Sequence, residues 1–390
     1  MVVAFSGGLD TTFCVRYLKE QQYAVITVTA DTGGMSLEEL SHIEERAHEL
    51  GVYAHHTFHV RQELFDRFGT YIIKGNILRG GVYPLCVGSE RVIQAEYVVR
   101  VAEQYGAQTV CHGCSGAGND QVRFDTAIKV LNPSLVISAP IRDLALSREA
   151  TLDFLKDRNI DFPSERKKYS VNQGIFGTTL GGAETHDSWQ SIPDYAYVRT
   201  VSPQRAPEQI GEIEIGFTQG MPCLLNKKRM EGYEILEAID SIGAAHGVGR
   251  GYHIGDTVIG IKGRLAFEAP GAMILIAAHR ELEKLVLTKW QSHIKEYLCA
   301  QYGMLFHEGL WLNPVMRDIE HFIDSTQQKV SGEVRVELFK GTVAVTGCKS
   351  PHSLMTSAAT YGEGTTLWSA EEVAGFSKLF GLQTVLAASS

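Results

Sequence analysis

The sequence predicts an α/β protein with a doubly wound parallel sheet in its N-terminal part, followed by an α+β part and a terminal helix. Three observations support this fold class. Strand and helix patterns alternate over residues 1–165, alternating apolar and polar runs follow in residues 166–362, and residues 363–390 contain an amphipathic segment. A chain of 390 residues exceeds the roughly 250–300 residues of a single core, so we expect domains with these boundaries.

Two hydrophobic patterns alternate in residues 1–165. Short, nearly continuous apolar runs, typical of strands buried on both faces, occupy residues 2–5, 24–30, 52–60, 108–111 and 135–139. Helix-like patterns occupy residues 10–21, 37–50, 91–105 and 147–158. This alternation predicts a parallel sheet covered by helices.

The pattern changes after residue 165. Residues 211–217 and 334–345 alternate apolar and polar side chains, as half-exposed antiparallel strands do, and Lys340-Gly341 predicts a hairpin turn. Residues 230–243 and 280–302 are predicted helices, and residues 271–278 form an apolar run of strand length. The second part is therefore expected to be α+β.

The C-terminal segment 368–382 predicts one more helix. Ser369 and Glu372 form a capping-box pattern, and Trp368 with Val373 matches a hydrophobic staple. An apolar face including Phe376 and Phe380 follows. This face must be buried, either on its own domain or on another subunit, and the sequence leaves both open.

Composition limits the class of partner and the compartment. The net charge of −9, without a basic stripe, argues against nucleic acid as a partner. No run approaches the ~20 apolar residues of a membrane helix, and no secretion signal precedes the first strand, so we expect a cytoplasmic protein. Seven scattered cysteines indicate reduced thiols. Cys111 and Cys114 form a single C-x-x-C, which lacks the second pair of a structural zinc site, although a redox pair stays open.

The stretch "AFSGGLDTT", residues 4–12, predicts a phosphate site. A strand, a Ser-Gly-Gly turn and a helix start bring backbone N–H groups and the positive end of a helix dipole to one point. Asp10 either serves a divalent cation on the phosphates or caps the helix. An ordinary βα turn is the alternative interpretation, and the pattern matches neither the Walker nor the dinucleotide-binding motif.

A second stretch, "HGCSGAGNDQVRF" at residues 112–124, suits two small zwitterions beside a nucleotide. Its glycines keep the backbone open, Asn119 can donate and accept, Asp120 can bind an ammonium, and Arg123 can bind a carboxylate in bidentate fashion. The alternative is a helix N-terminus capped by Asn119 or Asp120, with Arg123 in a surface ion pair.

Both stretches resemble a known family. "SGGLDT" resembles the pyrophosphate loop of the N-type ATP pyrophosphatases, and the second stretch resembles the H-G-x-T-G-x-G-N-D-Q-V-R-F segment of argininosuccinate synthase. Matches at residues 83–85, 169–170, 246–250, 268–271 and 324–327 follow in order, so the resemblance runs from residue 1 to about residue 380.

The resemblance implies an ATP pyrophosphatase (adenine nucleotide alpha hydrolase-like) domain, a synthetase domain and a C-terminal oligomerisation helix, typically in a homotetramer. It implies an ATP-dependent carbon–nitrogen ligase of arginine biosynthesis. Citrulline would be activated by ATP as a citrullyl-adenylate with release of pyrophosphate, and aspartate would then displace AMP to give argininosuccinate. Mg²⁺ would accompany ATP without an assigned side-chain ligand. No side chain is assigned as a general acid or base.

Site residues follow from the same resemblance. ATP would be bound by Ala4, Phe5, Ser6, Gly7, Gly8, Leu9, Asp10, Thr11, Thr12, Ala30 and Gly113. Aspartate would be bound by Ser115, Asn119 and Asp120, and citrulline by Tyr83, Asn119, Arg123, Ser170 and Thr179.

The sequence departs from the family where citrulline is held. The family's small hydroxyl residue, Glu and Tyr are here Gly88, Gly255 and Phe267. A further Glu is replaced by Gly181, and the usual Lys of the glycine loop by Ala117. Losing partners for a charged α-ammonium favours an N-acyl-citrulline, acetylated or succinylated, as substrate. Alternatively, Tyr252, His253 or Asp256 replaces the lost contacts and free citrulline remains the substrate.

Two other functions stay open at this stage. A tRNA-modifying enzyme would share the pyrophosphate loop, but it needs a basic surface that a chain of charge −9 does not indicate. An inactive homologue would explain the lost contacts, but it would more plausibly have lost Asp10, Asn119 or Arg123.

Overall fold

The computed structural model describes residues 1–88, 90–162 and 168–389. The expected domain boundary at 165/166 lies outside the described residues.

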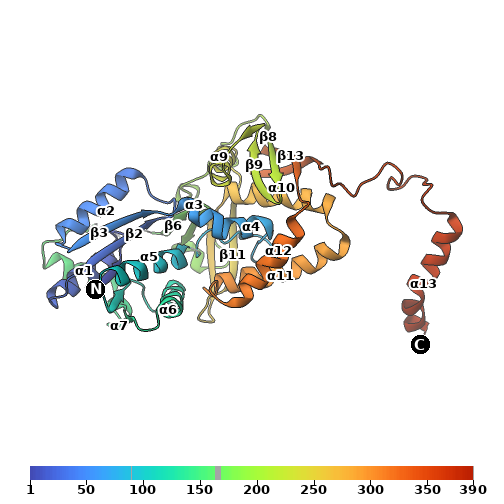
Figure 1. Ribbon diagram of the computed structural model, residues 1–390. Coiled ribbons are helices and arrows are strands. Elements are labelled where there is room, and N and C mark those ends of the chain that lie inside the picture. The colour runs from blue at the N-terminus through green and yellow to red at the C-terminus, as the bar shows by residue number, and fades with distance from the viewer. Residues whose placement is uncertain (89, 163–167, 390) are drawn as a thin grey trace.

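The N-terminal sheet is parallel, as predicted, with strand order β3-β2-β1-β4-β5. Its strands are β1 (Val2–Ala4), β2 (Ile26–Asp31), β3 (Ala54–His59), β4 (Thr109–Cys111) and β5 (Val136–Ser138). Its helices are α1 (Leu9–Glu20), α2 (Leu37–Glu49), α5 (Glu90–Gln104), α6 (Asp120–Leu131), α7 (Pro140–Asp143) and α8 (Arg148–Lys156). β1 lies at the centre of this order, so the loop that follows it opens at the middle of the carboxyl edge. The sheet lies at one end of the molecule, together with α1, α2, α5 and α6 (Figure 1).

The sheet is covered on both faces because neighbouring strand residues point in opposite directions. Val3 of β1 packs in one cluster with Phe13 of α1, Ala47 of α2 and Leu155 of α8. Val2 packs on the other face, in a cluster with residues of α5 and α6. This double layer of helices is the doubly wound arrangement that the sequence predicted.

Three consecutive helical segments between β3 and α5 had not been predicted. They are α3 (Arg61–Leu64), the π-helix η1 (Phe65–Gly69) and α4 (Thr70–Lys74). Phe65 and Phe68 are buried in the large core of the second part of the chain. Residues of the N-terminal half of the sequence therefore form part of the C-terminal core through these segments.

Two antiparallel sheets make up most of the second part. One has the order β10-β9-β8-β13-β14 and the other the order β11-β12-β7-β6. Their strands are β6 (Ser170–Gly174), β7 (Gly177–Gly181), β8 (Gly211–Thr218), β9 (Met221–Leu225), β10 (Lys228–Arg229), β11 (Arg250–Asp256), β12 (Lys262–Glu268), β13 (Gly332–Phe339) and β14 (Thr342–Lys349). The predicted hairpin is confirmed, since Lys340 and Gly341 connect β13 to β14 with φ of +43° and +86°.

The helices of this part are α9 (Gly232–Ala245), α10 (Pro270–Val286), α11 (Lys289–His307) and α12 (Pro314–Gln327), with short turns η2 (Ala183–His186) and η3 (Asp194–Ala196). Two expectations need correction. The apolar run 271–278 is the first half of α10, which Pro270 begins, and it is almost wholly buried. The predicted helix 280–302 is two helices, because Thr288 caps a new one by accepting a hydrogen bond from the Gln291 N–H.

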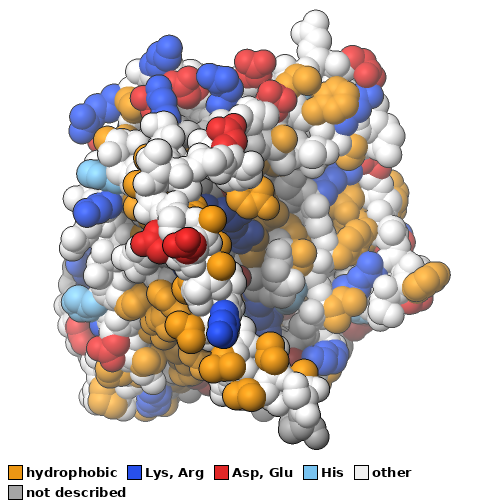
Figure 2. Space-filling model, turned by 90° about the vertical axis from the view of Figure 1, so that its right-hand side faces the viewer, with side chains coloured by type: hydrophobic (Ala, Val, Ile, Leu, Met, Phe, Trp, Pro, Cys, Tyr) orange, Lys and Arg blue, Asp and Glu red, His pale blue; other side chains and the backbone are white. Residues whose placement is uncertain are grey.

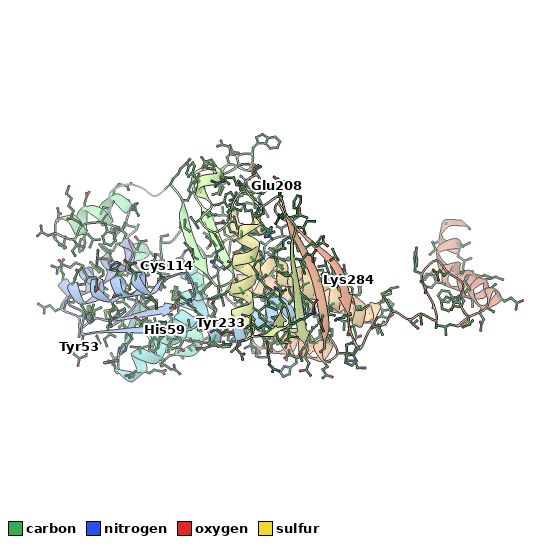
Figure 3. All side chains as sticks on the ribbon, turned by 90° about the horizontal axis from the view of Figure 1, so that it is seen from above. Tyr53, His59, Cys114, Glu208, Tyr233 and Lys284 are labelled. Carbon is green, nitrogen blue, oxygen red and sulfur yellow. The ribbon has the colours of Figure 1, made fainter. Side chains whose placement is uncertain are left out.

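The last helix, α13 (Ala370–Ser389), stands apart from the rest of the chain (Figures 1 and 3). The predicted capping box is formed by reciprocal hydrogen bonds of 2.7 and 3.2 Å between Ser369 and Glu372. None of its described residues is buried, and Phe376 and Phe380 are 64% and 76% exposed. Seen from the side to which α13 projects, hydrophobic side chains lie open on the surface that faces the viewer (Figure 2). This chain alone therefore leaves the apolar face uncovered.

Candidate active site

The phosphate loop has the geometry that its sequence predicts. Gly7 has φ +68°, and α1 begins directly after Gly8, whose position provides no side-chain cap for the helix N–H groups. The Ser6 and Thr11 hydroxyls are 3.3 Å apart, and Thr11 donates to the Gly8 carbonyl at 3.2 Å. The buried Thr12 hydroxyl has no hydrogen-bond partner among the described residues. Free N–H groups and hydroxyls thus converge where an anion can bind.

Asp10 does not cap α1, because the N-cap position belongs to Gly8 and Asp10 lies in the first turn. Its carboxylate is exposed beside the loop. Desolvation by the surrounding chain raises its pKa, and the charge of Arg148 opposes this effect. Of the two roles that the sequence left open for Asp10, capping of α1 is therefore wrong.

Gly113 brings the loop after β4 against the phosphate loop. A Cβ atom at Gly113 would lie 3.1 Å from Thr11 Cγ2 and 3.2 Å from Asp10 Cβ. Ala30 is buried near the end of β2, one strand away from β1. Two residues farther along, Thr32 accepts a hydrogen bond of 3.0 Å from Ile175 in the β6–β7 turn. The second part of the chain therefore contacts this edge of the N-terminal sheet.

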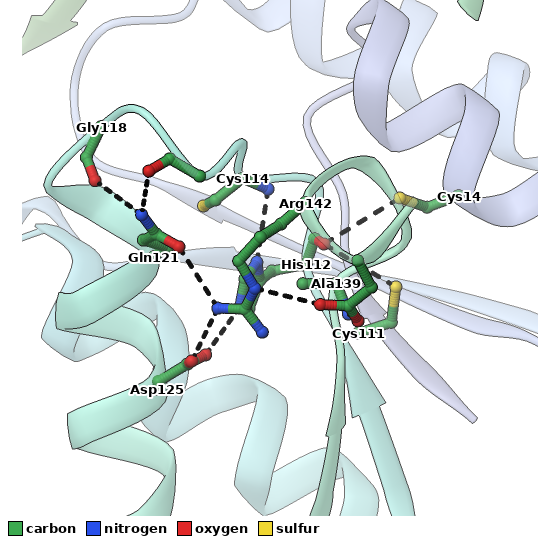
Figure 4. Close-up of polar contacts among 11 residues, drawn as sticks. Cys14, Cys111, His112, Cys114, Gly118, Gln121, Asp125, Ala139 and Arg142 are labelled. Atoms are coloured by element: carbon green, nitrogen blue, oxygen red, sulfur yellow. Dashed lines mark hydrogen bonds and ion pairs between the residues drawn. The ribbon is translucent and has the colours of Figure 1, made fainter. Parts of the chain in front are cut away.

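Polar contacts hold the glycine loop 112–119 in place (Figure 4). Gln121 Nε2 donates to the carbonyls of Gly116 and Gly118 at 2.7 and 3.3 Å. His112 Nε2 is 2.8 Å from Asp125 Oδ1, and Arg142 donates to the same carboxylate at 2.7 Å. The loop therefore keeps its shape by contacts from its own helix and from Arg142.

The C-x-x-C pair has the environment of inert thiols. Cys111 is buried, and burial raises the pKa of Cys114 to about 12. No group of three or more metal-binding side chains occurs among the residues that the structure describes. Cys114 lies on the side of the N-terminal sheet that faces the second part of the chain (Figure 3).

Asp120 and Arg123, from the first turn of α6, bind each other. Arg123 Nη1 donates to Asp120 Oδ1 at 2.9 Å, and Arg91 donates to the other carboxylate oxygen at 2.9 Å. Burial opposes ionisation of Asp120, but these two arginines hold its pKa below the usual value. Arg123 is only 5% exposed, so the alternative of a surface ion pair is wrong.

His307, at the end of α11, also binds Arg123. Its carbonyl accepts hydrogen bonds of 3.0 and 2.7 Å from the guanidinium. Asn119 precedes α6 without capping it, and its side-chain Oδ1 accepts a hydrogen bond of 2.9 Å from the N–H of Val258 in the β11–β12 turn. Residues from both halves of the sequence therefore build this part of the site. Ser115 is exposed on the loop.

Tyr83, predicted to bind citrulline, is 2% exposed. Its ring stacks on His253 at 5.4 Å and tilts against Phe267 at 5.3 Å between centroids. Thr179 of β7 pairs with Phe267 of β12 and is therefore brought to the same place. Ser170 begins β6 and is exposed opposite Gly181.

The positions that depart from the family lie around the same residues. A Cβ at Gly88, whose φ is +132°, would lie 3.3 Å from Arg123 Cζ. A Cβ at Gly255 would lie 2.6 Å from His253 Nε2 and 3.4 Å from Arg79 Cζ. A Cβ at Gly181 would meet no atom of the described residues within 4 Å, and Ala117 is exposed.

Two of the three proposed replacements for the lost contacts are engaged elsewhere. The Tyr252 hydroxyl accepts a hydrogen bond of 2.9 Å from the Ile192 N–H. The Asp256 carboxylate is 2.7 Å from Lys262 Nζ. Only His253 faces position 255, and burial followed by the charge of Arg79 lowers its pKa, which favours the neutral ring. None of the three supplies a free carboxylate there.

Sequence reasoning missed Arg79, Arg91 and His307. Arg79 and Arg91 stand near the "YPL" match, but no local pattern distinguishes them from surface arginines. His307 contacts Arg123 across 184 positions of sequence, which only the fold reveals.

Comparison with known proteins agrees with this geometry. The family model for the arginosuccinate synthase N-terminal HUP domain matches residues 1–161, and that for the arginosuccinate synthase C-terminal domain matches residues 169–387. Argininosuccinate synthase of Methanocaldococcus jannaschii is 39% identical over 99% of this chain and 97% of its own length. The enzyme of Xanthomonas campestris is 40% identical over 99% of this chain and 97% of its own length. A solved NMN synthetase from Francisella tularensis aligns with 41% of this chain and 61% of its own, with a TM-score of 0.30 and 14% identity, too loosely to support an inference.

Proposed function

This chain belongs to the argininosuccinate synthase family, and we propose that it joins the ureido group of a citrulline to aspartate at the expense of ATP. The observation that carries the proposal is the contact between the two loops. A Cβ added at Gly113 would lie 3.1 Å from Thr11 Cγ2 of the phosphate loop, so groups suited to amino acids stand beside groups suited to phosphates. A ligase that adenylates an amino-acid substrate needs this arrangement.

Residues of the phosphate loop are proposed to bind ATP, together with Ala30 and Gly113. Backbone N–H groups of the Ser6–Gly8 turn and the α1 N-terminus would bind the phosphates. Mg²⁺ is proposed to accompany ATP. It prefers one or two carboxylates plus phosphate oxygens, and Asp10 is the carboxylate of the phosphate loop itself. When bound, the ion supplies positive charge to the departing pyrophosphate.

The reaction is proposed to proceed in two displacements. The ureido oxygen attacks the α-phosphorus of ATP, forming a P–O bond while the bond to the bridging oxygen breaks and pyrophosphate leaves. The amine of aspartate then attacks the activated carbon, loses a proton, and AMP leaves with the bonding electrons. The chain mainly positions the reactants, with Asn119 and Asp120 proposed for aspartate and Tyr83, Arg123, Ser170 and Thr179 for the citrulline.

The assembly is part of the proposal. The exposed apolar face of α13 supports a homotetramer in which the helix packs on another subunit. We also propose three domains, at residues 1–165, 166–362 and 363–390, and a cytoplasmic location. No helix among the described residues is both long and apolar enough to cross a membrane.

The same chemistry on an N-acyl-citrulline is the second candidate. It is favoured by the absence of a free carboxylate at position 255, where the family has one. Salt-sensitive tRNA binding or a lack of ATP binding would instead support the two remaining alternatives.

Pyrophosphate release from ATP tests the proposed function. We expect release that requires Mg²⁺, a citrulline or N-acyl-citrulline, and aspartate for full turnover. Asp10→Asn should lower the rate at least about tenfold, because it removes one charged ligand or partner. Asp153→Asn, an exposed carboxylate on α8, is the matched control. Absence of release with every substrate would refute the proposed function.

A further inference from the structure

Position 255 marks the largest chemical change relative to the family, from a carboxylate to a glycine facing an arginine. We propose that the ureido substrate of this enzyme is an N-acyl-citrulline whose acyl group ends in a carboxylate, and that Arg79 binds that carboxylate. The inference rests on the proposed function and specifies the substrate class of the same site.

The site has few partners for a charged α-nitrogen of the substrate. A free α-ammonium has three N–H donors and a positive charge, and it needs oxygen partners when buried. Gly88, Gly255 and Phe267 supply none, where the family resemblance implies a hydroxyl, a carboxylate and a phenol. An amide nitrogen carries no charge and has one N–H, so an N-acyl substrate needs fewer partners here.

Positively charged groups lie where the family's carboxylate is missing. The space next to Gly255 faces the Arg79 guanidinium, whose Cζ would lie 3.4 Å from a Cβ at 255, and the His253 ring, at 2.6 Å. Arg123 adds a second positive charge near Arg79, and the carboxylates of Glu308 and of Asp256, which is paired with Lys262, add negative charge to the same surroundings. An α-ammonium at this point would be repelled by a like charge, whereas an anion would be attracted.

Arg79 has hydrogen-bond donors that are not in use, whereas most donors of Arg123 are. Arg79 donates to the Asp256 carbonyl at 2.7 Å, and no carboxylate pairs with it within the described ranges. Arg123, by contrast, already donates to Asp120 and His307 and is itself proposed to bind the citrulline part of the substrate. Arg79 is half-buried and keeps free donors of a guanidinium, whose fork matches a carboxylate.

One ring nitrogen in each of two histidines next to these arginines has no hydrogen-bond partner among the described residues, although His307 Nδ1 lies 3.2 Å from Arg123 Nη2. His253 and His307 are 6% and 8% exposed, and the Nε2 atom of each is buried without a hydrogen bond. Buried polar atoms are rarely left unpaired, so we expect a polar ligand to contact them. The carbonyl and carboxylate oxygens of a dicarboxylic acyl group, such as succinyl, provide acceptors that an acetyl group only partly provides.

Steady-state kinetics of pyrophosphate release test the proposal. Citrulline, N-acetyl-citrulline and N-succinyl-citrulline are compared at saturating ATP, Mg²⁺ and aspartate. We expect kcat/KM to be highest for N-succinyl-citrulline, exceeding that of the acetyl compound by about 10- to 100-fold, as for one charge-assisted bidentate contact. Calorimetric titration with an ATP analogue that cannot be cleaved after the α-phosphate should give the same order of affinity.

Variants of Arg79 test whether this residue causes the preference for N-succinyl-citrulline over N-acetyl-citrulline. Arg79→Met should bring the succinyl-to-acetyl ratio close to one, whereas Arg229→Met, an exposed arginine on β10, should leave the ratio unchanged. If Arg79→Met does not fold, Gly255→Glu serves instead. It sets a carboxylate against Arg79 once the His253 ring rotates, and should lower the succinyl preference at least about tenfold.

The outcomes separate the two levels of inference. Highest activity with free citrulline, or equal activity with the acetyl and succinyl compounds, would overturn this proposal and leave the proposed function standing. Tight binding of N-succinyl-citrulline without pyrophosphate release would support the recognition and refute the ligase reaction. Neither binding nor release with any compound would overturn both.

Discussion

Gly113 and Asp10 belong to different loops, yet a Cβ at Gly113 would lie 3.2 Å from the Cβ of Asp10. The two loops follow the adjacent parallel strands β4 and β1, whose carboxyl ends meet at one edge of the sheet. A side chain at position 113 would require Thr11 or Asp10 to move by a few tenths of an ångström.

Gly113→Val should therefore push the two loops apart. We expect the KM for ATP to rise by at least about tenfold, consistent with overpacking costs of about 1–3 kcal/mol. Gly118→Ala, in the same loop, is the control, since a Cβ there would meet nothing within 4 Å. Equal KM values for the two variants would contradict a tight contact at Gly113.

Asp120 links stability to pH. Its pKa is depressed in the folded protein, so its contribution to the free energy of unfolding is complete above its unfolded pKa of about 3.9. The contribution is lost as pH falls through the lower folded value. Because the side chain is 35% exposed, we expect only about 1 kcal/mol.

Urea unfolding of the wild type and Asp120→Asn between pH 7 and pH 3 checks this. The difference in the free energy of unfolding should be constant at higher pH and shrink below about pH 4. Asp153→Asn should show no such difference. A difference that grows as pH falls would reverse the sign and contradict the ion pairs.

Glu268 is a structural carboxylate of the second part. It is fully buried and accepts hydrogen bonds from the N–H groups of Val198, Arg199 and Thr200 and from the Thr200 hydroxyl, with distances of 2.7–3.2 Å. Glu268→Gln replaces one acceptor oxygen by a donor facing other donors. We expect a loss of about 2–4 kcal/mol in the free energy of unfolding, measured by urea titration. Glu212→Gln, exposed on β8, should be within about 0.5 kcal/mol of the wild type.

Charges on the apolar face of α13 test the proposed assembly. The double change Phe376→Glu and Phe380→Glu should prevent burial of that face, so light scattering should show a mass below that of a tetramer. Gln383→Glu on the same helix should not change the mass. A wild-type monomer in solution would contradict the proposal directly.

Local patterns predicted the elements whose cause is local. The strand, glycine turn and helix of the phosphate loop formed as expected, because the apolar run and the Ser-Gly-Gly turn specify them without distant help. The Lys340-Gly341 turn and the Ser369 capping box are of the same kind. The run 271–278 was misjudged, because a helix buried on all sides has no polar face to reveal its period.

Placement in three dimensions could not be predicted in this way. The resemblance named Arg123, but its partner His307 is set by the packing of α11, and Arg79 reaches Gly255 only through the course of β11. The segments α3, η1 and α4 are buried in the C-terminal core. Their helical structure depends on contacts with residues distant in sequence, which their own local pattern does not reveal.

The bond between Arg123 and His307 has a consequence for synthesis of the chain. A nascent chain can fold the sheet around β1 long before residue 307 is made, since domains generally fold from the N-terminus during synthesis. Until α11 arrives, the guanidinium of Arg123 lacks the carbonyl that accepts two of its hydrogen bonds. The proposed amino-acid site is therefore completed late in translation, and an early-terminated chain would have the phosphate loop without the finished surroundings of Arg123.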